Sequence, residues 1–383
     1  MALHFTVEEF AERRSRAISK MTEAGLDGLL LFKQESIYYL TGHDTYGFVF
    51  FQCLYLGSDG KITLLARAPE LRQAQHTSVI EDIRIWVDRD RANPAVDLRD
   101  ILEDHGCRNK RLGIEFEAYG LTGRSARLVY GALDGFCDLL DASELINRLR
   151  VVKSATEMAY VRRAAQLADE ALDAAIALAY PGAFEGDILA AMMETIFRGD
   201  GDFPAHDFII GSGEDALLYR YHSGRRHLSE KDQLFLEFAA AFRHYHANLI
   251  QTIVIGPPTQ RQLDMHKAVV DSYYAALEAL KPGRPIGEVF DAHAHVLDTA
   301  GFQEQRMNAC GYSLGATFIP NWMDWPMFYH GNPCIAEPNM IFFPQVFLAD
   351  NRHRFTMGVG QTVVVTEKGC QSLSKASLDL LVH

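Results

Sequence analysis

The sequence lacks any apolar run that approaches the roughly 18 residues of a membrane-spanning helix, and its charged N-terminal residues lack the apolar core of a signal peptide. Its six cysteines are scattered and form no CxxC pair, so they predict reduced thiols instead of a disulfide framework. Lys and Arg are dispersed in a chain whose net charge is −13, which argues against a nucleic-acid partner. We therefore expect a cytoplasmic protein that binds neither a membrane nor nucleic acid.

The length of 383 residues, with 48% hydrophobic and 23% charged residues, is typical of a globular chain with two domains. In residues 1–150 apolar segments alternate with helical patterns, which predicts an α/β domain. In residues 151–383 helical patterns flank long strand-like segments, which predicts an α+β domain. We interpret residues 144–152 as the connection between the two.

Signals for the start of a helix stand out at two places. Thr6 precedes a helical pattern over residues 7–24, and Ser154 precedes one that extends to about residue 178. Glu9, three positions after Thr6, strengthens the first of these signals. Apolar runs predict strands at residues 48–56, 233–242 and 245–255.

Several phrases, in their order along the chain, resemble the creatinase/prolidase/methionine aminopeptidase superfamily. They are SIYYLTG (36–42), LGIE (112–115), RVVKSATE (150–157), FIIGSG (208–213), GYSLG (311–315), EPNM (337–340) and VVTEKG (364–369). The resemblance implies an α/β creatinase-like domain over residues 1–150 and an α+β pita-bread catalytic domain over residues 151–383. It also implies a homodimer whose active sites take residues from both subunits.

Metallopeptidases of this superfamily bind two metal ions through two Asp, one His and two Glu. Carried over to this chain, those positions fall on Glu237, Asn248, Tyr312, Gln345 and Gly360. Asn and Gln are neutral, Tyr is protonated at neutral pH with a reference pKa of about 10, and Gly has no side chain to bind with. Because a pair of hard dications needs anionic oxygens and imidazole, we expect no metal and no cofactor, as in creatinase.

Two residues are the predicted catalytic groups. Glu237 interrupts an apolar strand, so its carboxylate should be partly desolvated, and it can act as a general acid/base or as a nucleophile. The alternative is a buried carboxylate held by the hydrogen bonds of its neighbours. His222 matches the histidine that creatinase uses for proton transfer, with His227 as the rival assignment.

The predicted substrate-binding residues combine polar groups with aromatic rings, because aromatic walls suit a planar cation. Core packing is the alternative for most of the aromatic residues. The set comprises Tyr312, Gln345, Asn248, Trp322, Trp325 and Phe48.

Two histidine clusters are alternatives for metal binding. His244 and His246 form a His-x-His pair on a predicted strand, and such a pair can bind zinc. Asp291, His293 and His295 lie on a predicted helix, where residues two apart diverge.

The segments KQESIYYLTGHDTYGF (33–48) and RQAQ (72–75) are similar to the ectoine hydrolase branch of the superfamily. This resemblance implies a metal-independent hydrolase that opens ectoine, a small zwitterionic cyclic amidine, to N-acetyl-2,4-diaminobutyrate. Three alternatives remain: a creatinase-type amidinohydrolase acting on creatine or another small amidine or guanidine, a metal-dependent Xaa-Pro peptidase-like hydrolase, and a binding module without catalysis.

Overall fold

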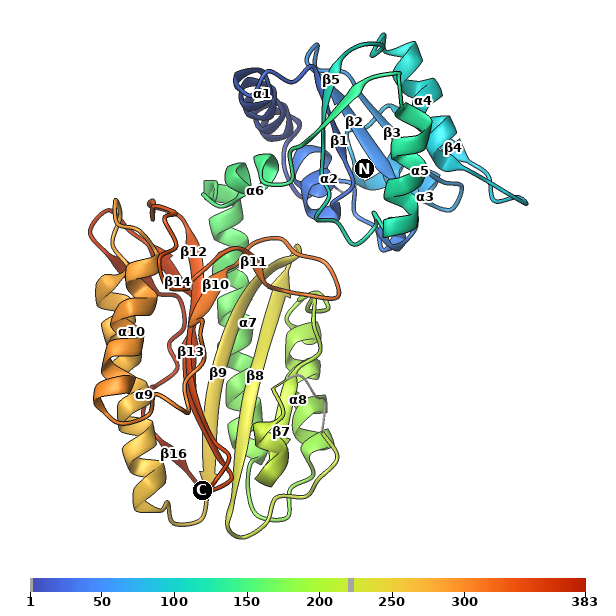
Figure 1. Cartoon of the computed structure of the whole chain (residues 1–383). Coiled ribbons are helices and arrows are strands. Elements are labelled where there is room, and N and C mark those ends of the chain that lie inside the picture. The colour runs from blue at the N-terminus through green and yellow to red at the C-terminus, as the bar shows by residue number, and fades with distance from the viewer. Residues whose placement is uncertain (1–2, 220–223) are drawn as a thin grey trace. The chain divides into compact units, whose positions relative to one another are not determined.

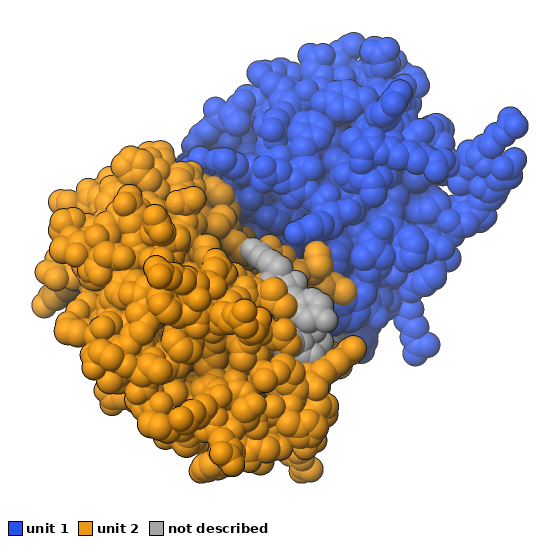
Figure 2. Space-filling view, turned by 60° about the horizontal axis from the view of Figure 1, so that its bottom comes forward, with its two compact units in different colours: residues 1–150 blue, residues 151–383 orange. Residues whose placement is uncertain are grey.

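A computed structural model describes residues 3–219 and 224–383 of the chain. The chain divides into two compact units, Met1–Arg150 and Val151–His383, which we call unit 1 and unit 2 (Figure 2).

Unit 1 is built on a mixed sheet of six strands among the described residues, in the order β4-β3-β2-β1-β5-β6 (Figure 1). β1 pairs antiparallel with β2 and parallel with β5. The strands are β1 (Gly28–Leu31), β2 (Cys53–Gly57), β3 (Ile62–Arg67), β4 (Asp82–Trp86), β5 (Arg111–Ile114) and β6 (Asp138–Asp141).

Helices cover both faces of this sheet, because successive side chains of a strand point to opposite faces. Leu29 and Leu31 pack with residues of α1, α2, α3 and α6. Leu30 and Phe32 pack with residues of α4 and α5. The helices are α1 (Val7–Glu23), α2 (Gln34–Thr41), η1 (Gly47–Val49), α3 (Glu70–Thr77), α4 (Pro94–Asp104), α5 (Gly123–Leu133) and α6 (Leu145–Arg150).

Unit 2 holds a larger sheet with the strand order β11-β10-β12-β13-β9-β8-β7. β14 pairs with β12 and β15, and β16 pairs with β9. The strands are β7 (Ile209–Ser212), β8 (Asp232–Phe242), β9 (Tyr245–Ile255), β10 (Gly311–Ser313), β11 (Asp324–Met327), β12 (Ile341–Asp350), β13 (Phe355–Gln361), β14 (Val363–Val365), β15 (Cys370–Ser372) and β16 (Leu381–Val382).

Two helix pairs pack on this sheet (Figure 1). α7 contacts β8 and β9 and pairs with α8, while α9 contacts β12 and β13 and pairs with α10. Small side chains allow the close approach of α7: Ala164 and Ala165 pack directly against Ala247 of β9. The helical elements are α7 (Ala155–Leu178), α8 (Glu185–Arg198), η2 (Gly213–Leu217), α9 (Gln260–Ala279) and α10 (Gly287–Thr299).

The helix starts predicted from local signals are confirmed. The Thr6 hydroxyl accepts the N–H of Glu9, and Ser154 forms a complete capping box with Glu157. Within the described residues, none of the helices has the length and apolar character that crossing a membrane requires.

The local structure differs from the prediction in two segments. The predicted strand at residues 48–56 begins instead with the short helix η1, because the Thr45 hydroxyl accepts the N–H of Gly47 and turns the chain there. The predicted connection at residues 144–152 does contain the boundary between the two units, but it also includes helix α6, whose Leu145, Ile146 and Leu149 pack into the core of unit 1.

Candidate active site

The strand register of unit 2 lines up the positions to which the resemblance assigns the metal ligands of the superfamily's peptidases. Glu237 on β8 lies opposite Ile250 on β9, Ile250 lies opposite Gly360 on β13, and Gly360 lies opposite Gln345 on β12. Directly paired residues point to the same face of a sheet. The four residues therefore form one row across four strands.

A second row runs beside the first. Asn248 lies two residues before Ile250, and Phe343 lies two residues before Gln345 and pairs with Tyr312 on β10. Alternate residues of a strand share a face. Glu237, Asn248, Tyr312, Gln345 and Gly360 thus belong to one face of the sheet, which we call the site face.

Glu237 is a buried carboxylate. Its residue is 7% exposed, in a strand that is otherwise almost wholly buried. Phe235 lies beside it on the same face, and its ring centroid lies 6.1 Å from that of Phe347 on β12. Burial excludes the water that would screen the carboxylate, so its charge acts strongly on any group placed against it.

Gly360 shows why the last ligand position cannot hold a carboxylate in this structure. A Cβ atom built on Gly360 would lie 2.9 Å from Cζ and 3.0 Å from Cε2 of Phe343. Ordinary contacts of a Cβ begin at about 3.4 Å. The fully buried ring of Phe343 therefore occupies the space that a side chain at position 360 would need.

The residues of the site face do not fit a pair of divalent cations. One carboxylate, two neutral amides and a phenol stand where the peptidases have four carboxylates and an imidazole. Across the described residues, no group of three or more His, Cys, Asp and Glu side chains is placed to hold a metal ion.

Two amide oxygens on the site face are buried without a hydrogen-bond partner among the described residues: Oδ1 of Asn248 and Oε1 of Gln345. The Asn248 backbone is fixed by Thr362, whose hydroxyl oxygen accepts the Asn248 N–H at 2.7 Å. An unsatisfied buried acceptor costs free energy, so such atoms in a folded protein need an explanation.

Tyr312 is held by a residue of the following loop. Its phenol oxygen accepts the indole N–H of Trp322 at 2.9 Å and the Nδ2–H of Asn248 at 3.5 Å. Trp322 is 3% exposed, and its ring centroid lies 4.9 Å from that of His206. The structure thus brings together three of the residues that are predicted to bind the substrate.

His206 is a part of this network that the sequence did not reveal. Its Nδ1 lies 2.6 Å from the carbonyl oxygen of Asp207, the geometry of an Nδ1–H that donates to that oxygen. A lone histidine in a loop carries no signal of its own, and only the contact with Trp322 distinguishes it.

Glu185, at the start of α8, was also missed. It is fully buried, and its carboxylate accepts the backbone N–H groups of Ser212 at 2.7 Å, Arg225 at 2.7 Å and Arg226 at 2.9 Å. Glu185 therefore ties the end of β7 to the chain just before β8. The local sequence indicates only an acidic residue in the first turn of a helix.

The interpretation of His244 and His246 as a zinc-binding pair is wrong. Arg243 and His244 have φ angles of 53° and 65° and form the turn between β8 and β9, so His244 does not lie on a strand. His246 is buried with both ring nitrogens engaged: Nε2 accepts the N–H of Ala205 at 2.9 Å, and Nδ1 lies 2.8 Å from the His244 carbonyl oxygen. Burial lowers the pKa of His246 to about 4, so it is a neutral structural histidine.

The residues of the second histidine cluster also lie in different surroundings. The Nδ1 atom of His293 lies 2.9 Å from the Ser272 hydroxyl in the interior, whereas Asp291 pairs with His330 at the surface. Burial lowers the pKa of His293 to about 4. As expected for residues two apart on a helix, these side chains do not converge on a common site.

The remaining predicted site residues are His222, Phe48 and Trp325. His222 lies outside the described residues, and its role stays a prediction. Phe48 belongs to η1 of unit 1 and is 3% exposed. Trp325 packs against a core cluster that includes residues of α9 and α10, which favours the packing role left open from the sequence.

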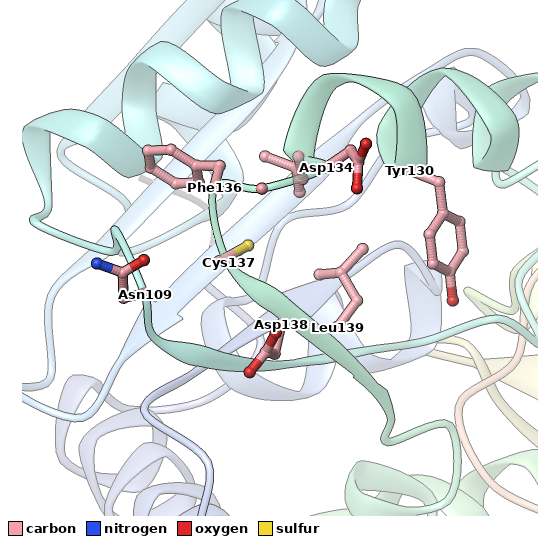
Figure 3. Close-up of a pocket in the computed structure, with 9 residues that line it drawn as sticks. Asn109, Tyr130, Asp134, Phe136, Cys137, Asp138 and Leu139 are labelled. Atoms are coloured by element: carbon pink, nitrogen blue, oxygen red, sulfur yellow. The ribbon is translucent and has the colours of Figure 1, made fainter.

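A surface pocket of about 420 Å³ lies in unit 1, beside β6 (Figure 3). Its carboxylates, Asp134 and Asp138, are exposed to solvent, and burial raises the pKa of Cys137 to about 11, which disfavours a reactive thiolate. The pocket therefore lacks the buried, converging polar groups of the site face.

The fold and the site face together define a pita-bread hydrolase with a creatinase-like N-terminal domain, as expected from the sequence. The chain belongs to metallopeptidase family M24, whose model matches residues 159–367. A Creatinase/Prolidase N-terminal domain model matches residues 13–152.

Curated relatives span the whole chain. It is 25% identical over 401 residues to an ectoine hydrolase of Halomonas elongata, covering 100% of this chain and 99% of that protein. It is 23% identical over 380 residues to an Xaa-Pro dipeptidase of Pyrococcus furiosus, covering 97% of this chain and 99% of that protein.

Solved structures confirm the fold. Dipeptidase PepE from Mycobacterium ulcerans superposes with a TM-score of 0.86 at 23% identity, covering 99% of both chains. The X-Pro aminopeptidase of Thermotoga maritima superposes with a TM-score of 0.84 at 18% identity, covering 97% of this chain and 99% of that one.

Proposed function

We propose that this chain is a metal-independent hydrolase that opens the cyclic amidine ectoine to N-acetyl-2,4-diaminobutyrate. The observation that carries the proposal is the charge of the site face: of its five ligand-equivalent positions, Glu237 alone bears a carboxylate. One buried anion balances one cation, and an amidinium is a monocation. The substrate's own charge would then take the place of the metal ions.

The similarity to the ectoine hydrolase of Halomonas elongata over the full length supports this substrate. Xaa-Pro dipeptidases are about as similar in sequence, so identity alone does not separate the two activities. The replacement of four of the five peptidase ligands favours the amidine substrate, because a peptidase of this family depends on its metal pair.

In the proposed reaction, Glu237 lies against the amidinium and either activates a water molecule or attacks the amidine carbon itself. The water oxygen bonds to that carbon, one ring C–N bond breaks, and the departing nitrogen takes up a proton. The products are an amide and an amine within one open-chain molecule. His222 is assigned the proton transfer to the leaving nitrogen, Tyr312 orients the substrate, and the working unit is a homodimer.

The first experiment is proton NMR of ectoine with protein dialysed against a chelator. Appearance of the acetyl resonance of an N-acetyl-diaminobutyrate would support the substrate and the metal independence together. Activity that returns only with added zinc or manganese would contradict metal independence. If ectoine stays intact under both conditions, the same assay with creatine and with an Xaa-Pro dipeptide tests the two alternatives.

Glu237→Gln tests the assigned catalytic residue, because it keeps the shape of the side chain and removes its charge and its basicity. We expect kcat to fall by about 10²- to 10⁴-fold, the usual contribution of a general base. A correctly folded variant with near wild-type turnover would refute the role of Glu237. The melting temperature of the variant shows whether a loss of activity reflects unfolding.

A further inference from the structure

We infer that Asn248 and Gln345 form a pair of hydrogen-bond acceptors that binds the N–H groups of a planar amidinium. The inference deepens the proposed function by assigning the recognition of the substrate's N–C–N unit to two particular side chains. It starts from the two amide oxygens that are buried without a partner among the described residues, Oδ1 of Asn248 and Oε1 of Gln345.

An amide oxygen can only accept hydrogen bonds, so each of these atoms needs a donor that the described residues do not supply. Neighbouring groups hold both residues in place. Asn248 donates through Nδ2 to the phenol oxygen of Tyr312 at 3.5 Å, which directs Oδ1 away from that ring. Gln345 donates its backbone N–H to the carbonyl oxygen of Cys310 at 3.0 Å.

The positions of the two residues fit a small planar group. Asn248 lies on β9 and Gln345 on β12, the two strands that flank β13. Their backbones are therefore two strand spacings apart across the sheet and two residues apart along it, or about 12 Å in all, and both side chains extend from the same face. Between them Gly360 has no side chain, and the Phe343 ring that lies against Gly360 has no hydrogen-bond donor.

A positively charged donor suits this face, because Glu237 places a carboxylate in the same two rows. An amidinium meets both requirements: it is a monocation, and its two nitrogens present N–H groups in diverging directions within one plane. A neutral amide of the same shape has N–H groups on its nitrogen only. Its oxygen would lie against one of the two acceptor oxygens, where no hydrogen bond can form.

The test uses acetamidinium chloride as the cation and acetamide as its neutral analogue. Acetamidinium should raise the melting temperature of the wild-type protein, since a ligand that binds only the folded state stabilises it. Acetamide should not. Asn248→Leu and Gln345→Met, which replace each amide by an apolar group of similar size, should each weaken acetamidinium binding and raise the KM for ectoine roughly tenfold.

Melting temperatures of the ligand-free variants separate binding from structure. Removing an unsatisfied buried oxygen should leave the melting temperature unchanged or raised. Gln361→Met is the matched control: Gln361 is also buried on β13, but its Oε1 accepts the Ser372 hydroxyl and its Nε2 donates to the Ala376 carbonyl, each at 2.8 Å. This variant should melt lower and still bind acetamidinium. Gln345→Glu keeps an acceptor at position 345 and should retain binding.

The two proposals fail separately. If ectoine is hydrolysed but its KM stays unchanged in Asn248→Leu and Gln345→Met, the acceptor pair is refuted and the proposed function stands. If ectoine is not hydrolysed but acetamidinium binding depends on both residues, the amidinium site stands and the substrate is another amidine. Wild-type protein that responds equally to acetamidinium and acetamide, or to neither, would overturn the inference.

Discussion

Gly360→Ala tests whether the ring of Phe343 occupies the space that a side chain at position 360 would need. The new Cβ would lie 2.9 and 3.0 Å from two ring carbons of Phe343 and 3.1 Å from the carbonyl oxygen of Pro344. These contacts are several tenths of an ångström too short, and the fully buried ring has little room to retreat. Overpacking of this kind costs about 1–3 kcal/mol, although the same substitution at an unstrained position would stabilise by about 0.4–1 kcal/mol.

The assay is urea or thermal unfolding, where a loss of 1 kcal/mol corresponds to roughly 2–4 °C for a unit of this size. Gly369→Ala serves as the control, because a Cβ there meets nothing within 4 Å. Phe343→Ala alone should cost about 3–5 kcal/mol through the cavity it leaves. The double variant should cost less than the sum of the two single ones, because the added methyl group then enters that cavity. Equal stability of Gly360→Ala and Gly369→Ala would refute the reasoning.

Three further predictions concern the surroundings of the site. Trp322→Phe removes the N–H that holds Tyr312 at 2.9 Å. Its KM for ectoine should rise about three- to tenfold, and a loss confined to kcat would contradict a positioning role. Glu185→Gln weakens three backbone hydrogen bonds and should lower the free energy of unfolding by about 2–4 kcal/mol in urea titrations; an unchanged midpoint would contradict that anchoring role. His246 has its pKa lowered from 6.5 to about 4 in the folded state, so the unfolded chain binds more protons between these values. The free energy of unfolding should therefore fall by up to about 3 kcal/mol as the pH falls from 6.5 to 4. A His246→Gln variant with the same pH dependence as the wild type would refute this origin.

Features set by local chemistry were predictable from the sequence. The caps at Thr6 and Ser154 depend on residues within one helical turn, and both were found as expected. The burial of Glu237 follows from its place in an apolar strand, where alternation sets which side chains share a face. Helix α6 was missed because six residues are too few to show a clear helical period.

Features set by contacts between distant segments were not predictable. The resemblance identified Gly360 as a lost ligand position, but that Phe343 fills its space depends on how β12 packs against β13. In the same way, His206 is linked to the site only by its contact with Trp322, which lies more than a hundred residues later in the sequence. His244 is the opposite case. The alternation of residues predicted a strand there, but a tight turn with positive φ angles interrupts the strand.

The proposed exchange of metal for substrate cation accounts for several features of the site face at once. A metal pair requires carboxylates and an imidazole. Without the metals, the carboxylates would be unfavourable, since closely spaced buried anions repel one another. Replacing them by Asn248, Gln345, Tyr312 and Gly360 removes that repulsion and keeps acceptor oxygens on the sheet. Retaining Glu237 leaves one carboxylate that can face the amidinium group of the substrate. The same strand scaffold would thus bind a cation that is supplied and consumed with every turnover instead of one that stays resident.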